Sequence, residues 1–194
     1  MTKFNNSSFP PNGPWDLRLS QLACPELVPV ETLHENPWYS VRNRGGFFTV
    51  EYRLRQVVIF PVVNKDSIVL VRVKRPVIKD TPLELPAGAI EPNEEATTGA
   101  AREFLEETGI KVTNLDRFMP MVPISVSSTR NPNLSYIFRI DITEKEYTNR
   151  KPHDNEIYSV ERLAINDVAK KMASGEIYVS LTLGVLGIFL ASMY

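Results

Sequence analysis

The chain has 194 residues, of which 43% are hydrophobic and 23% are charged, the makeup of an ordinary globular protein. Lys and Arg total 22 against 23 for Asp and Glu, so a net charge of −1 excludes a general electrostatic attraction to nucleic acid. The single Cys24 excludes an internal disulfide, and the start MTKFNN lacks the pattern of a signal peptide. We therefore expect a cytoplasmic protein with one main domain and a small extension.

Residues 1–55 are expected to form a small N-terminal β-unit, separate from a main domain of residues 56–194. The irregular start is rich in turn-forming residues: Pro10, Pro11, Gly13 and Pro14. Two β-like stretches follow at 38–41 and 47–54, and the turn residues at 43–46 favour a hairpin between them.

The main domain mixes strand and helix patterns. Stretches 57–63 and 67–73 are rich in β-branched residues and flank a polar turn, which predicts a second hairpin. Further strands are expected at 119–122, 136–142 and 157–160, and helices at 94–108, 165–174 and in the C-terminal tail. This mixture predicts an α/β or α+β fold in which helices cover one sheet.

The C-terminal tail carries no charged side chain from residue 177 to 194, a length that just reaches the threshold for a transmembrane helix. Polar and small residues interrupt it: Ser180, Thr182, Gly184, Gly187 and Ser192. Glu176 precedes the tail, where a membrane anchor would have a basic flank. We expect a buried helix and no membrane partner, with a membrane anchor as the alternative.

The stretch LPAGAIEPNEEATTGAAREFLEETGI, residues 85–110, contains the boundaries of a helix. Asn93 is the predicted N-cap, and Glu94 and Glu95 suit the positive end of the helix dipole in the first turn. Gly109 is predicted to end the helix in a left-handed conformation. The helix is therefore expected to be about fifteen residues long.

Three carboxylates share one side of this helix. At about 100° per residue, Glu103, Glu106 and Glu107 fall within one arc, opposite Ala101, Phe104, Leu105 and Thr108. Gly99 lies in the same arc and leaves the backbone open to close approach, at a cost of about 1 kcal/mol in helix propensity. Like charges so close repel one another, and a divalent cation removes the conflict.

The ligand types in this cluster favour a hard cation. Oxygen ligands without a nearby His or Cys suit Mg²⁺ first and Mn²⁺ second, and neither His34 nor His153 has the spacing of a zinc site. Magnesium completes its shell with substrate phosphates, which points to phosphate chemistry. The alternative is a solvated face in which Arg102 and Glu106 form a surface pair worth about 0.3 kcal/mol.

The same stretch resembles the Nudix box. Its matching positions are Gly88, five residues, Glu94, seven residues, and then REFLEETGI at 102–110. The resemblance implies a Nudix fold, a mixed β-sheet between helices, and hydrolysis of a nucleoside diphosphate linked to another moiety. It further implies that Glu103 and Glu107 are metal ligands, with Glu106 as another, and that Arg102 holds the cluster in place.

The residues before the box narrow the resemblance to the ADP-ribose diphosphatase branch. LELPAG and the pair Arg75-Pro76 are similar to that branch. The likeness implies that the Ala87 carbonyl is a metal ligand, that Arg75 binds a phosphate, and that Glu84 supports the site by hydrogen bonding. The guanidinium fork of arginine suits phosphate oxygens, although Arg75 as a surface arginine at a strand end is the alternative.

The N-terminal unit is also similar to that branch, whose members use an extra β-element to build a homodimer and complete the substrate pocket across it. Glu51 and Arg55 match positions implicated in recognition of the nucleotide end. Val50 stands where some relatives have a stacking aromatic residue. Phe47, Phe48 or Trp38 would stack in its place, or serve in the core or the dimer interface.

Two loops after the box complete the expected site. The loop 122–131 has the proline of that branch but lacks its glycine, and Arg130 is interpreted either as a reader of a second phosphate or sugar hydroxyl or as a solvated residue. In the acidic loop before strand 157–160, the likeness makes Glu156 the first and Asp154 the second candidate to activate water. The alternative there is an ordinary polar loop.

The sequence therefore predicts magnesium-dependent hydrolysis of a nucleoside diphosphate sugar, with ADP-ribose giving AMP and ribose 5-phosphate as the leading case. Other Nudix substrates are alternatives, including GDP-mannose, UDP-glucose, a dinucleoside polyphosphate and a damaged nucleotide. A module that senses ADP-ribose without cleaving it is an alternative of another class. Its expected mark is the loss of box carboxylates, and all of them are present.

Overall fold

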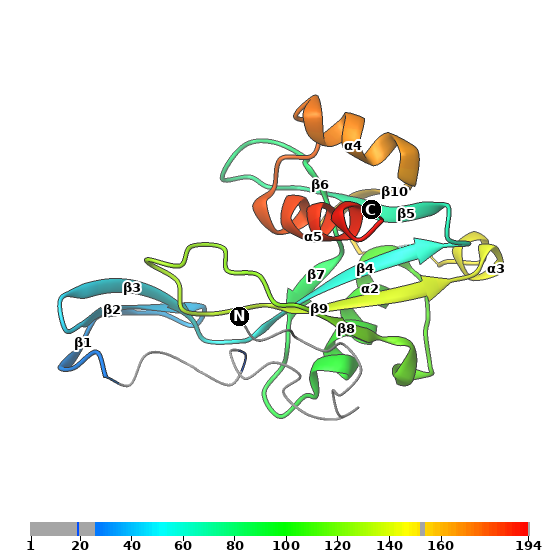
Figure 1. Ribbon diagram of the computed structural model, residues 1–194. Coiled ribbons are helices and arrows are strands. Elements are labelled where there is room, and N and C mark those ends of the chain that lie inside the picture. The colour runs from blue at the N-terminus through cyan, green and yellow to red at the C-terminus, as the bar shows by residue number, and fades with distance from the viewer. Residues whose placement is uncertain (1–18, 20–25, 152–153, 194) are drawn as a thin grey trace.

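The computed structural model describes residue 19 and residues 26–151 and 154–193. Within these ranges the chain forms a small three-stranded sheet and a larger sheet covered by helices (Figure 1). The interpretations of Cys24, of the proline-rich start and of His153 concern residues outside the described ranges.

The N-terminal sheet projects to one side of the body (Figure 1). It consists of β1 (Val30–Glu35), β2 (Tyr39–Arg44) and β3 (Phe47–Tyr52), all antiparallel and in that order. The predicted hairpin is confirmed, since Gly45 and Gly46 turn the chain with φ of 55° and 94°. Strand β1 was not predicted, because all six of its residues are exposed and its sequence has no alternation of apolar and polar residues.

The larger sheet has seven strands. They are β4 (Gln56–Val63), β5 (Ser67–Val73), β6 (Leu83–Glu84), β7 (Ala87–Ala89), β8 (Met119–Met121), β9 (Tyr136–Ile142) and β10 (Ile157–Ala164). The order is β10-β5-β4-β9-β8, with β6 beside β5 and β7 beside β4. Only the pairing of β4 with β9 is parallel, so the sheet is mixed. Every longer strand of this sheet coincides with a predicted one.

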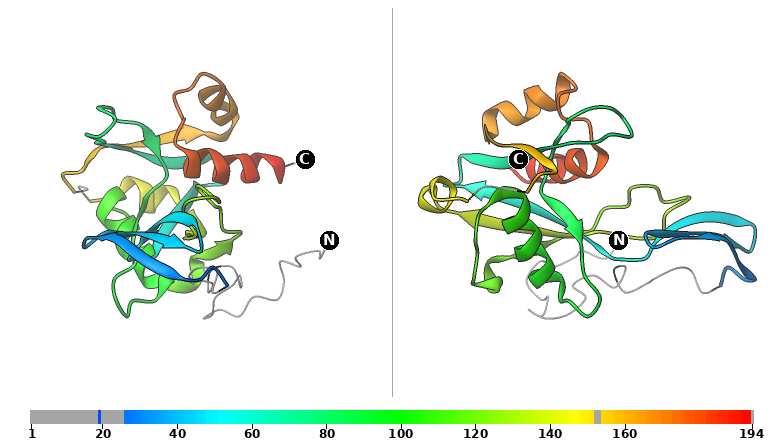
Figure 2. Two further views of the ribbon diagram at one scale, coloured as in Figure 1. Left: turned by 90° about the vertical axis from the view of Figure 1, so that its left-hand side faces the viewer. Right: turned by 180° about the vertical axis from the view of Figure 1, so that it is seen from behind.

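Helices lie on both faces of this sheet (Figure 2). One face is covered by α2 (Ala96–Thr108), and the other by α4 (Ile165–Ala173) and α5 (Ser180–Ala191). A short helix, α3 (Glu144–Thr148), and a 3₁₀ turn, η1 (Leu115–Arg117), were not predicted. The predicted mixed sheet between helices is confirmed.

Strand β4 shows how the two layers are built. Val57 and Ile59 pack in the same apolar cluster as Phe104 of α2, whereas Val58 and Phe60 pack with α5. Successive side chains of a strand point to opposite faces, so a strand buried on both sides is apolar throughout. Strand β4 therefore anchors the helices on both faces of the sheet. It also holds α2 next to β7, the strand that precedes this helix in the chain and pairs with β4.

The C-terminal tail forms helix α5, as predicted, and its Thr182, Val185 and Leu186 are buried. Among the helices in the described part of the chain, none is both long and apolar enough to cross a membrane.

The predicted N-cap of α2 was wrong. Asn93 has a φ of 68° and lies in the preceding turn, and the helix begins at Ala96, with Glu95 at the cap position. The reason is Glu94, whose carboxylate accepts a hydrogen bond from the backbone N–H of Glu91 at 2.8 Å and so closes that turn. The end of the helix was predicted correctly, since Gly109 has a φ of 73° and donates to the carbonyl of Leu105.

Candidate active site

The predicted glutamates lie where α2 passes the segment of β6 and β7. Strand β7 pairs with the start of β4 and contacts α2, so it is the part of the sheet that lies against this helix. Gly88 is at the closest point, because a Cβ atom built there would overlap the carboxyl group of Glu103. Only glycine leaves room for that carboxylate at this position.

Glu107 is the most perturbed carboxylate of the cluster. It is largely buried, and its Oε2 accepts a hydrogen bond from the backbone N–H of Ala87 at 2.9 Å. Burial raises the pKa of Glu107 to about 8, the Ala87 N–H opposes that shift, and the negative charges of Glu103 and Asp154 add to it. A positive charge bound next to this carboxylate, such as a metal ion, would stabilise its ionised form.

Glu103 and Glu106 are linked through Arg102. Burial raises the pKa of Glu103, while the guanidinium of Arg102, 2.8 Å away, lowers it. Glu106 is more exposed and lies 3.2 Å from the same guanidinium, so the surface pair of the alternative interpretation is present. Glu103, with 13% of its side chain exposed, is the carboxylate that the fold holds inside the cluster.

Arg102 is itself held from the opposite side. Glu94 accepts two hydrogen bonds from it, at 2.9 Å and 3.1 Å, and the carbonyl of Ala89 accepts a third at 2.7 Å. The hydrogen bond to Glu94 is the largest of the influences that raise the pKa of Arg102. The arginine therefore ties α2 to the turn before it and fixes the approach of Glu103.

Arg75 and Glu84 form a second charged pair beside the cluster. The Nε and Nη2 groups of Arg75 donate to the two oxygens of Glu84 at 2.8 Å and 2.9 Å. Glu84 is buried, whereas 44% of the Arg75 side chain is exposed. The Glu84 hydrogen bond is the main cause that raises the pKa of Arg75, and the charges of Glu107 and Glu156 add to it. Arg75 thus lies within electrostatic range of both.

Backbone hydrogen bonds tie the acidic loop to the end of α2. The N–H of Lys151 donates to the carbonyl of Gly109 at 2.8 Å, and the N–H of Asp154 donates to the carbonyl of Glu106 at 3.0 Å. The carboxylate of Asp154 accepts from the N–H of Glu156 at 2.9 Å. The fold therefore brings Asp154 to the glutamate cluster, 47 residues along the chain from Glu107, and places Glu156 where its charge acts on Arg75.

The other predicted substrate residues contact groups outside this cluster. Glu51 pairs with Arg44 in the N-terminal sheet, and Arg55 donates to the hydroxyl of Tyr136 at 2.5 Å. Arg130 donates to the carbonyl of Phe48 at 3.1 Å and so holds its loop against β3. Within one copy of the chain, none of the hydrogen bonds described for these three side chains reaches the glutamates of α2.

Two features of the site were missed in the sequence. Glu94 was placed in the first turn of the helix and among the matching positions of the box, but its role as the main partner of Arg102 was not predicted. The opposite charges of Glu94 and Arg102, eight residues apart, were the available signal. The close approach of Gly88 to Glu103 had no local signal, since the two positions meet only after β7 joins the sheet.

The carboxylates of the cluster offer oxygen donors for a metal ion. Within residues 26–151 and 154–193, no three His, Cys, Asp or Glu side chains already converge on one point that a metal ion would occupy. Magnesium, however, is usually bound through one or two carboxylates together with water and substrate phosphates. The negative charge of Glu103 acts on the pKa of Glu107, and both side chains offer only oxygen ligands, so the chemistry of the donor set fits such an ion.

Comparison with protein families matches residues 52–182 to the NUDIX domain. A search of curated proteins finds no match. The matched segment contains β4 to β10, the whole of α2 and every carboxylate of the cluster. Because it spans more than half of the chain, this protein belongs to the NUDIX domain family and carries the domain of a pyrophosphohydrolase.

Proposed function

We propose that this protein hydrolyses the diphosphate bond of a nucleoside diphosphate sugar, with ADP-ribose as the leading substrate and AMP and ribose 5-phosphate as products. The observation that supports the proposal is that an exposed guanidinium, Arg75, lies within electrostatic range of a largely buried carboxylate, Glu107, at one end of α2. A guanidinium suits the negative phosphates of such a substrate, and a carboxylate suits the positive metal ion that accompanies them.

Mg²⁺ is the proposed cofactor, with Mn²⁺ as a substitute. Glu103 and Glu107 would hold it, with Glu106 and the carbonyl of Ala87 as further ligands. When bound, the ion supplies positive charge that neutralises the diphosphate during in-line attack by water. Gly88 and Arg102 keep Glu103 in place for this task.

The side chains of the site divide the remaining work. Two N–H groups of Arg75 are occupied by Glu84, and the rest of its exposed fork is available to orient a phosphate. The oxygen of water attacks one phosphorus, the bond from that phosphorus to the bridging oxygen breaks, and Glu156 accepts the proton of the water. Asp154 is the second candidate for that base, since its charge reaches Glu107.

A second copy of the chain is the proposed protein partner. The pairing of β2 with β3 places Phe48, Val50 and Tyr52 on one face of the N-terminal sheet, and all three are exposed. An exposed apolar face of this kind suits an interface. In a homodimer the N-terminal unit of one copy would bring Glu51 and Arg55 towards the substrate of the other. We propose a cytoplasmic location and no nucleic-acid partner.

A substrate panel tests the function. ADP-ribose, GDP-mannose, UDP-glucose and a dinucleoside polyphosphate are incubated with the protein, with and without EDTA, and phosphate is measured after phosphatase treatment. We expect turnover of ADP-ribose that EDTA abolishes. Turnover of another compound of the panel but not of ADP-ribose would contradict ADP-ribose as the substrate. Binding of ADP-ribose without turnover of any compound would favour a sensor.

Variants of α2 distinguish the two interpretations of its glutamates, as metal ligands or as a solvated helix face. Glu103→Gln and Glu107→Gln should each lower kcat by about two orders of magnitude or more, because each removes a ligand charge. Glu95→Gln is the matched control, since Glu95 is exposed at the start of the same helix. Near wild-type turnover in both cluster variants would contradict their assignment as ligands.

A further inference from the structure

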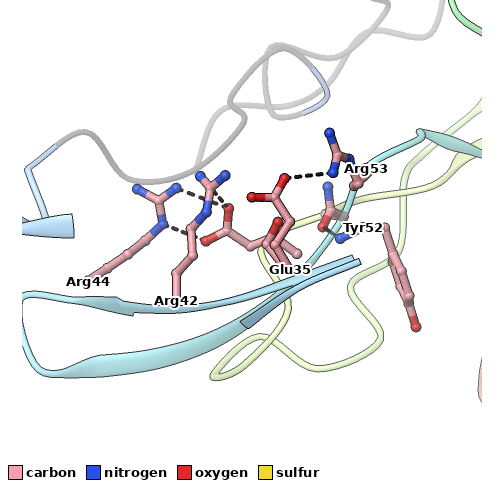
Figure 3. Close-up of a pocket in the computed structure, with 8 residues that line it drawn as sticks. Glu35, Arg42, Arg44, Tyr52 and Arg53 are labelled. Atoms are coloured by element: carbon pink, nitrogen blue, oxygen red, sulfur yellow. Dashed lines mark hydrogen bonds and ion pairs between the residues drawn. The ribbon is translucent and has the colours of Figure 1, made fainter. Parts of the chain in front are cut away.

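A pocket of about 280 Å³ opens on the N-terminal sheet, apart from the residues of the glutamate cluster (Figure 3). Its walls come from β1, β2 and β3, the residue that follows β3, and the loop before β9. The lining residues are Glu35, Ser40, Arg42, Arg44, Glu51, Tyr52, Arg53 and Asn133. Three arginines against two glutamates leave the wall with an excess of positive charge.

The glutamates do not satisfy all three arginines equally. Glu51 accepts two hydrogen bonds from Arg44, at 2.5 Å and 3.0 Å, and Glu35 pairs with Arg53 at 2.6 Å. Arg42 lies 3.4 Å from the same Glu51, and this is its one ion pair among the residues that the structure describes (Figure 3). Burial raises the pKa of Glu51, but hydrogen bonds from Arg44 and Thr49 outweigh it and lower the pKa overall, so Glu51 is committed as an anion to Arg44.

Arg42 also carries an unsatisfied donor. In the described part of the chain, its Nε–H is a buried side-chain group without a hydrogen-bond partner. A guanidinium has five N–H donors, and leaving a buried charged donor unpaired is costly. The fold therefore holds a guanidinium at the pocket that its own acidic residues do not fully serve.

Neutral donors line the same pocket. Asn133 uses its amide oxygen to accept the backbone N–H of Tyr52 at 2.8 Å, which leaves its amide nitrogen to donate. Ser40 adds a hydroxyl on the same wall and is itself buried. Neutral donors and a guanidinium in one pocket suit a tetrahedral anion with several oxygens better than a planar carboxylate.

We infer that this pocket binds the phosphate group of a compact phosphate monoester through Arg42, as a second ligand site besides the glutamate cluster. The volume lies at the lower end for ligand pockets, about 300 Å³, which fits a small molecule. A sugar phosphate and a nucleoside monophosphate share this chemistry. The pocket contains Glu51, which is proposed above to face the substrate of a partner copy, but it contains none of the glutamates of α2. Binding measured in EDTA, without turnover, therefore tests the pocket separately from the proposed hydrolysis.

Calorimetric titration of the full chain in EDTA tests the site. Ribose 5-phosphate and AMP are the two phosphate probes, and ribose and adenosine are their uncharged counterparts. We expect at least one phosphate probe to bind and its uncharged counterpart not to bind. Whichever of the two binds more tightly identifies the source of the phosphate.

Variants locate the binding. Arg42→Gln should weaken the phosphate probe about tenfold or more, and Arg42→Lys should weaken it less, because the charge remains while the fork is lost. Arg139→Gln is the matched control, since Arg139 pairs with Asp141 on β9, outside the pocket. Glu103→Gln is the control for the glutamate cluster, and both controls should bind as the wild type does.

The outcomes decide the inference in either direction. Loss in Arg42→Gln with retention in both control variants supports it, provided that the thermal melt of Arg42→Gln shows a folded protein. Should that variant melt early, the graded response of Arg42→Lys decides instead, and an unchanged affinity there overturns the inference. No binding of either phosphate probe to the wild type, equal loss in Arg139→Gln, or loss in Glu103→Gln alone also overturns it.

Discussion

Gly88 of β7 and Glu103 of α2 approach so closely that a side chain at position 88 would occupy the space of the Glu103 carboxylate. Strand β7 is fixed by pairing with β4, and the helix is fixed by Phe104 in the core. Neither element can retreat without loss of packing. The position of one proposed metal ligand thus depends on the absence of a side chain elsewhere.

Gly88→Ala should therefore displace Glu103 and lower kcat about 100-fold, because small misplacements at a catalytic centre are costly. Steady-state turnover of the substrate found in the panel measures the effect. Gly187→Ala is the control, since a Cβ at that position in α5 meets nothing within 4 Å. Equal turnover in the two variants would contradict the proposed dependence.

Glu107→Gln should raise the thermal stability of the metal-free protein while it removes activity. The wild-type carboxylate is largely buried beside the charges of Glu103 and Asp154, whereas glutamine keeps an acceptor for Ala87 without a charge. In EDTA we expect a melting temperature about 2 °C or more above that of the wild type. Mg²⁺ should stabilise the wild type and not this variant.

The exposed Glu106 provides the control for that experiment. Glu106→Gln should melt with the wild type in EDTA, because 47% of the Glu106 side chain is exposed and water already solvates its charge. A Glu107→Gln protein that melts below the wild type would show that the carboxylate contributes stability, contrary to the expectation.

Glu146→Gln should lower stability at neutral pH and lose its effect in acid. The hydrogen bonds from Arg117, at 2.6 Å and 3.1 Å, are the main cause that lowers the pKa of Glu146 from 4.5 to about 2. A lowered carboxyl pKa stabilises the fold above pH 4.5, and this contribution disappears as the pH falls towards 2. After allowance for solvent screening we expect about 1 kcal/mol in the free energy of unfolding.

Urea unfolding of the wild type and the variant at several pH values checks this. The difference between the two free energies should be constant from pH 7 to pH 5 and then shrink. A difference that persists unchanged below pH 3 would assign the effect to packing rather than to the ion pair.

Arg75→Lys should lower kcat/KM about tenfold or more, because lysine keeps the charge but cannot bond Glu84 and a phosphate through one planar fork. Glu84→Gln keeps an acceptor for the arginine and should cost less. Kinetics with the preferred substrate measure both, and Arg139→Lys serves as the control on an unrelated ion pair. A larger effect of Glu84→Gln than of Arg75→Lys would indicate that Glu84 itself contacts the substrate.

Sequence patterns predicted the elements whose signal is local. The run of β-branched residues gave β4, and the spacing of Glu103, Phe104 and Glu107 gave α2 with one packing side and one acidic side. The left-handed end at Gly109 also followed from a single residue. Such features arise within a few residues of the chain, so their periodicity or conformational preference is visible without the fold.

Tertiary structure alone decided what depends on distant pairing. It set β4 beside β9, about 80 residues away, and tied Asp154 to the carbonyl of Glu106. It also placed the Arg42 guanidinium in a pocket where the described residues give it one ion pair, 3.4 Å from Glu51. Burial, hydrogen-bond satisfaction and charge neutralisation depend on neighbours in space, and a linear sequence does not name those neighbours. The sequence by itself therefore determined the acidic helix. The folded molecule determined which groups lie next to its carboxylates: Gly88, the N–H of Ala87 and Asp154.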